Sequence, residues 1–153
     1  MNKKLDIDLK IEFYPIKGKG KEEEIKDRMR LCKKYYELVL HEKPDDLFLI
    51  IDEKDGNECK GLYFFTKQHM VKFDRHKDNN QENGTNNEIT LNIKPISKQV
   101  TNVEVNYKAS NDFILTFRIY PCCEKLIFHA SERDSNKLKD IMDEFIIPNL
   151  REG

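Results

Sequence analysis

Seven short apolar segments, each bounded by turn-forming residues, precede one segment with helical periodicity. The short segments cover residues 47–51, 61–66, 70–73, 89–93, 100–107, 113–119 and 126–129. Their lengths, and the alternation of apolar and polar side chains in several of them, predict antiparallel strands. In the last segment, apolar residues at 138, 141, 142, 145 and 146 have the spacing of one helix face. This order predicts an α+β, mainly β fold in which an amphipathic helix closes one end of a sheet.

The first 44 residues differ from the rest in pattern and in charge. They carry 12 Lys/Arg and 9 Asp/Glu, whereas residues 45–153 carry 15 and 19. Strict alternation from Leu5 to Phe13 predicts a half-buried strand over about residues 4–13. Helical spacing then runs from Lys21 to Leu40 and Pro44 follows, which predicts a helix over about residues 21–42. We therefore expect a strand–helix extension, residues 1–44, before a main domain, residues 45–153.

Residues 76–88, with the sequence HKDNNQENGTNNE, form a polar, low-complexity stretch between two predicted strands. This composition cannot bury an apolar face, so we expect a disordered or long surface loop.

Composition excludes several classes of protein. With 27 basic and 28 acidic residues, the net charge is −1, so no chain-wide positive field is available and no direct nucleic-acid binding is expected. No apolar run has the length of a membrane-spanning helix, and the first residues lack the pattern of a signal peptide. We expect a protein of the cytosol or nucleus with ordinary reduced cysteines.

Residues able to support catalysis are scattered along the chain. The sequence has no Gly-rich phosphate loop and no Gly-x-Ser-x-Gly elbow. Cys122, Cys123 and His129 come nearest to a nucleophile–base pair or a metal site, but a third catalytic member and a fourth ligand are missing. We expect a binding module without catalytic residues, metal or cofactor. An enzyme that uses these three residues is the least favoured alternative.

The order of motifs over residues 46–150 resembles a pleckstrin-homology (PH) domain, in which a bent seven-stranded antiparallel sheet is capped by a C-terminal helix. Within that superfold it resembles the N-terminal PH domain of the core subunit of general transcription factor IIH. The matching motifs are Gly61-Leu-Tyr63 after a charged turn, Phe128-His129-Ala-Ser131 before the last helix, and Pro148 just beyond that helix.

The resemblance implies a nuclear protein-interaction domain of a transcription and DNA-repair complex that acts in nucleotide excision repair. Members of that family dock acidic, aromatic-bearing segments of activators or repair factors on the open face of strands five to seven. The partner-binding residues it implies here are Asn102, Glu104, Val105, Lys108, Ile114, Thr116 and Arg118. Family members have a lysine near Glu104 and glutamines near Ile114 and Thr116, so this sequence departs from the pattern at three positions.

A peripheral membrane PH module that binds anionic lipids is the alternative function, with a cytoplasmic, membrane-peripheral location. Lys54 and Lys60 lie among four acidic residues in the stretch where lipid-binding members have a basic motif. The basic run from Lys17 to Lys21 still offers weak attraction to an anionic surface.

Overall fold

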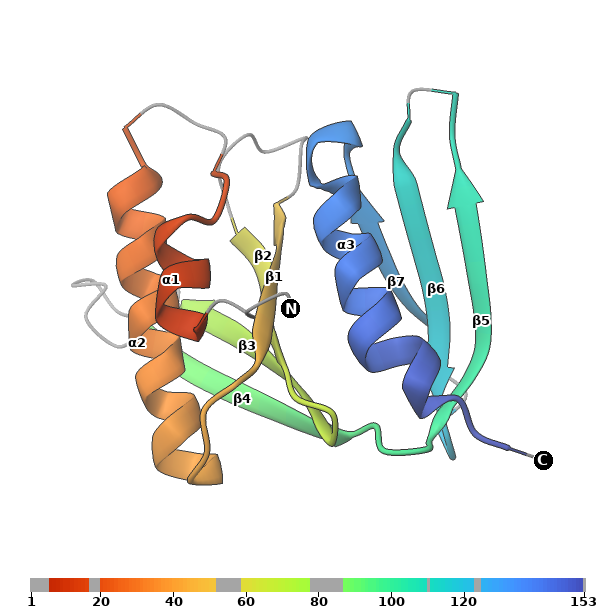
Figure 1. The fold of residues 1–153 in the computed structure, drawn as a ribbon. Coiled ribbons are helices and arrows are strands. Elements are labelled where there is room, and N and C mark those ends of the chain that lie inside the picture. Colours follow the sequence, from red (N-terminus) through yellow and green to blue (C-terminus); the bar gives the residue numbers. More distant parts are fainter. Residues whose placement is uncertain are drawn as a thin grey trace.

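The computed structural model describes residues 6–16, 20–51, 59–77, 87–109, 111–122 and 125–152 of the 153-residue chain. Within these residues the fold is α+β and mainly β, with two helices, two antiparallel sheets and a C-terminal helix (Figure 1). None of the described helices is long and apolar enough to cross a membrane.

The seven strands expected in the main domain are confirmed, and they divide into a sheet of four and a sheet of three. The first sheet has the order β1-β2-β3-β4 and the second β5-β6-β7. The strands are β1 Asp46–Ile51, β2 Cys59–Phe65, β3 His69–Lys77, β4 Asn87–Pro95, β5 Val100–Tyr107, β6 Phe113–Ile119 and β7 Lys125–Ala130.

Part of the expected polar loop is strand, because β3 continues to Lys77 and β4 begins at Asn87. The main-chain hydrogen bonds of a hairpin need no apolar side chains, so pairing extends into the polar sequence. Residues 78–86 lie outside the described residues.

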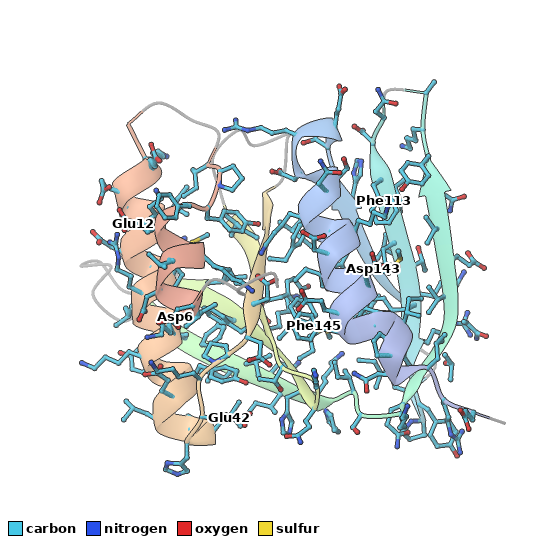
Figure 2. The ribbon with its side chains drawn as sticks, viewed as in Figure 1. Asp6, Glu12, Glu42, Phe113, Asp143 and Phe145 are labelled. Atoms are coloured by element: carbon cyan, nitrogen blue, oxygen red, sulfur yellow. The ribbon has the colours of Figure 1, made fainter. Side chains whose placement is uncertain are left out.

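The main core lies between the two sheets and is closed by the C-terminal helix. The ring of Phe128 lies 6.1 Å from that of Phe48 in β1 and 5.6 Å from that of Phe117 in β6, measured between centroids. Figure 2 labels Phe113 of the second sheet and Phe145 of the C-terminal helix, both fully buried in this core. The core therefore depends on aromatic side chains from both sheets.

The C-terminal helix begins as α3, Ser135–Ile141, continues as a π turn, Met142–Ile146, and ends as a 3₁₀ turn, Ile147–Asn149. The predicted apolar face is confirmed, since Leu138, Ile141, Phe145 and Ile146 are buried and Met142 is partly buried. The buried Asn149 amide donates to the carbonyls of Phe145, at 2.7 Å, and Lys67, at 2.9 Å, and so fixes the end of the helix against the first sheet.

The predicted N-terminal strand is wrong, because residues 7–12 form the helix α1, Ile7–Glu12. Ile7 and Ile11 are buried one helical turn apart, while Leu9 and Phe13 are exposed. A short alternating pattern also contains apolar residues spaced i, i+4, so it fits one face of a helix as well as one face of a strand. Packing on the first sheet selects the helix.

The predicted second helix is confirmed as α2, Glu22–Leu40. Its buried residues Ile25, Met29 and Tyr36 join α1 in a second apolar cluster on the face of the first sheet opposite the main core. The sheet contributes Leu47, Leu49, Leu62, Phe64, Val71 and Phe73 to this cluster. Because β1 and β2 are buried on both faces, their sequences are nearly continuous apolar runs. The described residues of the extension thus pack on the first sheet and not on the second.

Candidate functional site

The outer face of the second sheet is the side turned away from the main core. In β6, Phe113, Leu115 and Phe117 are buried, and the residues between them are partly exposed. Ile114, Thr116 and Arg118 therefore project outward, as the alternation in the sequence predicts.

Strand register shows which side chains accompany these three on the outer face. Thr116 is paired with Glu104 of β5 on one side and with Ile127 of β7 on the other. Arg118 is opposite Lys125, and Ile114 lies between Asn106 and His129. We call this surface the docking face; it consists of Glu104, Asn106, Ile114, Thr116, Arg118, Lys125, Ile127 and His129.

A β-bulge in β5 shapes one end of the docking face. The register shifts between Thr101, which is opposite Arg118, and Glu104, which is opposite Thr116. Asn102 and Val103 together oppose Phe117, and Asn102 has a φ of 54°. Asparagine tolerates this left-handed conformation better than most residues. The extra residue bends the strand, and a groove forms beside it.

The groove has a volume of about 320 Å³ and is lined by Asn102, Val103, Glu104, Thr116, Arg118 and Lys125. Two cations, Arg118 and Lys125, stand opposite each other on neighbouring strands. Like charges placed this way repel, so the arrangement costs stability in the absence of an anion. No ion pair joins either side chain to another residue that the structure describes. Glu104 brings one negative charge into the groove.

Two of the residues implied by the resemblance lie apart from the docking face. Val105 pairs with the buried Leu115, so it lies on the inner side of the sheet, where it is 41% exposed at the β5 edge. Lys108 lies in the turn after β5, and its backbone N–H donates to the carbonyl of Asp112. Asn102, Glu104, Ile114, Thr116 and Arg118 are brought together on the docking face or at its groove.

Sequence reasoning missed the contribution of β7. Lys125 lines the groove, and Ile127 is 60% exposed beside Thr116. The alternation along β7 carries the signal for these residues. Phe128 and Ala130 are buried, so the side chains at the alternate positions, including Ile127, face outward.

The structure does not bring Cys122 and His129 together. Cys122 is exposed in the turn before β7, whereas His129 lies near the other end of that strand. The Nε2 atom of His129 is 3.1 Å from Oδ2 of Asp112, and both residues lie at the end of the β6–β7 pair that is away from Cys122. Cys123 falls outside the described residues. Among those that are described, no group of three or more His, Cys, Asp or Glu side chains could hold a metal ion.

The chain was compared with family models, curated proteins and solved structures. No family model matches it, and no significant match exists among the curated proteins or the solved structures.

Proposed function

We propose that this chain is a non-enzymatic, PH-like protein-interaction domain of a nuclear transcription and DNA-repair complex. Its docking face binds acidic, aromatic-bearing disordered segments of activators or repair factors. The observation that carries this proposal is the pair of opposed cations, Arg118 and Lys125, beside the exposed Ile127 on the outer face of the second sheet.

The cation pair provides the electrostatic part of recognition. An acidic segment supplies carboxylates that relieve the repulsion between Arg118 and Lys125 and bind both. Arg118 is partly buried in β6, the central strand of the sheet, and the planar guanidinium of an arginine can form a bidentate contact with a carboxylate. Lys125, at the start of the edge strand, is more exposed.

The apolar residues provide the anchoring part. Ile114 and Ile127 lie on neighbouring strands of the docking face, displaced from each other by two residues along the strands. An aromatic side chain of a docked segment can lie over them while nearby acidic residues reach the cations. The partly exposed Thr116, between Ile127 and Glu104, offers a hydroxyl to the backbone of the segment.

The arrangement of elements supports a PH-like assignment. Four strands form one sheet, three form the next, and the C-terminal helix closes the core between them. The docking face lies on strands five to seven, which is the surface that the resemblance implies for partner binding.

Binding of an acidic peptide with two aromatic residues, measured by fluorescence anisotropy at low and high salt, tests the proposal. The double variant Arg118→Gln/Lys125→Gln should bind at least about tenfold more weakly, since each contact to a charged group contributes on the order of 1 kcal/mol. Lys34→Gln/Lys139→Gln removes two exposed cations from α2 and α3 and serves as the matched control.

Equal losses in the two double variants would contradict a specific site and would indicate general charge attraction. Binding of the wild type to phosphatidylserine vesicles but not to the peptide, abolished by the first double variant, would replace the proposed partner with a membrane.

A further inference from the structure

The strand β4 forms an edge of the first sheet, and β3 is its one neighbour among the strands of the described residues. Figure 1 shows β4 along the border of that sheet. The strand runs over nine residues, Asn87–Pro95, and pairs with β3 without a register shift. A long, regular edge presents a row of backbone donors and acceptors to any chain that can pair with it.

The alternation of hydrogen bonds between β3 and β4 shows which β4 residues direct their backbone groups away from β3. The N–H of Ile96 donates to the carbonyl of Gln68 at 2.9 Å, just beyond the paired residues His69 and Pro95. In an antiparallel pair, residues that exchange hydrogen bonds alternate with residues that do not. Even-numbered residues of β4 therefore direct their backbone groups to β3. Odd-numbered residues direct theirs to the edge, where Pro95 offers a carbonyl but no N–H.

The same odd-numbered residues carry the apolar side chains. Ile89, Leu91 and Ile93 lie on the sheet face covered by α2, since Leu91 and Ile93 are opposite Phe73 and Val71 of the second apolar cluster. Ile89 and Leu91 are partly buried against that cluster, and Ile93 is 37% exposed. The edge is thus apolar where its backbone is free to pair.

We propose that two copies of this chain associate through β4, antiparallel, about a two-fold axis at Leu91. Only the odd-numbered residues of β4 direct backbone groups away from β3. An odd-numbered residue of one copy must therefore lie opposite an odd-numbered residue of the other. Centred on Leu91, this register places Leu91 opposite itself and Ile89 opposite Ile93 of the second copy.

The sequence of β4 is complementary to itself in this register. The apolar residues Ile89, Leu91 and Ile93 are placed opposite one another, and Thr90 is placed opposite Asn92 of the second copy. A shift by two residues in either direction keeps the parity but leaves an isoleucine without an aliphatic partner. Self-complementarity of this kind is what an isologous two-fold interface requires, and it favours a second copy over an unrelated strand.

The pairing would join the two four-stranded sheets into one and remove both β4 edges from solvent. The docking face lies on the other sheet, so each copy in the dimer keeps its own docking face. The inference does not depend on the proposed function.

Sedimentation velocity over a wide range of protein concentrations tests the proposal with a charge swap. Wild-type protein should show a concentration-dependent monomer–dimer equilibrium. Thr90→Lys/Asn92→Lys places like charges opposite each other twice per dimer, at two exposed positions of β4, and should weaken association at least tenfold. Thr90→Lys/Asn92→Glu places unlike charges there and should keep at least most of the wild-type affinity. Glu23→Gln/Glu24→Gln, which changes the net charge by as much as the first variant at exposed positions on α2, is the matched control and should behave as wild type.

A wild type that stays monomeric at every concentration overturns the proposal. So does a Thr90→Lys/Asn92→Glu variant that dimerises no better than Thr90→Lys/Asn92→Lys. Circular dichroism of each variant establishes that a change in association is not a change in folding.

Discussion

The carboxylate of Asp46, the first residue of β1, accepts a hydrogen bond from the ammonium of Lys137 in α3, 91 positions further along the chain. The Nζ atom of Lys10 in α1 lies 3.4 Å from the other carboxylate oxygen. The Asp46 side chain is 3% exposed and also accepts the backbone N–H of Leu47. One buried carboxylate therefore links the N-terminal extension, the first sheet and the C-terminal helix.

Asp46→Asn should lower the free energy of unfolding by about 2 kcal/mol. The amide keeps the shape of the side chain but leaves two lysine ammonium groups without their counter-charge, and breaking a buried ion pair in this way is costly. This expected loss in the free energy of unfolding is smaller than is usual for a broken buried ion pair, because both lysine side chains are partly exposed. Urea unfolding measures the change. Asp45→Asn, at the exposed neighbouring position, should alter stability by less than about 0.5 kcal/mol, and equal effects at both positions would contradict the role given to Asp46.

The ion pair between Asp8 of α1 and Lys33 of α2 should make a small, pH-dependent contribution to stability. Its Nζ–Oδ1 distance is 2.7 Å, and the hydrogen bond from Lys33 lowers the pKa of Asp8 from its ordinary value of 3.8. A carboxyl whose folded pKa is depressed stabilises the fold above its unfolded pKa. That contribution is lost as the pH falls through the folded pKa.

Asp8→Asn should therefore lower the free energy of unfolding at neutral pH by less than about 1 kcal/mol, because the carboxylate is largely exposed. The difference from wild type should disappear as the pH is lowered through and below 3.8. Unfolding curves at several pH values test this. Asp140→Asn, at an exposed position on α3, should show no such dependence, and a difference at Asp8 that persists in acid would contradict the assignment.

Glu104→Lys should strengthen binding of the acidic peptide severalfold. Glu104 lines the groove with Arg118 and Lys125, so it repels the carboxylates that those cations attract. Reversal of its charge should raise the association rate and steepen the dependence of affinity on salt. Stopped-flow binding at two salt concentrations measures both effects. Glu152→Lys, an exposed reversal near the C-terminus, is the control, and an equal gain in that variant would show that net charge alone is responsible.

The strands and the last helix were predictable because a buried face imposes a period on the sequence. The alternation of Phe113, Leu115 and Phe117 determines which side of β6 meets the core, and Leu138, Ile141 and Phe145 do the same for the helix. In these elements, local pattern and tertiary packing agree.

The N-terminal segment was not predictable in the same way. Its alternation from Leu5 to Phe13 is compatible with two periods, and contact with the outer face of the first sheet decides between them. That contact involves residues such as Phe64, which is distant in sequence. A strand is also stable only when it pairs with another strand, and the sequence does not indicate which strand would pair with residues 5–13.

The docking face was only partly predictable. Ile114, Thr116 and Arg118 follow from alternation alone, whereas Val105 cannot share a face with its neighbour Glu104. The bulge at Asn102 and Val103, which shapes the groove, has no sequence signal beyond an asparagine suited to positive φ. Lys125 lies just outside the predicted strand, residues 126–129, and the resemblance implies no partner-binding residue in that strand, so neither Lys125 nor Ile127 is among the predicted site residues.

The most direct test of the docking face is a titration of isotope-labelled protein with the acidic, aromatic-bearing peptide, followed by backbone amide NMR. The account predicts chemical-shift changes concentrated on Thr116, Arg118, Lys125 and Ile127, with little change in α2. Changes confined to β4 or to the inner β5 edge around Val105, or no change at saturating peptide, would contradict it.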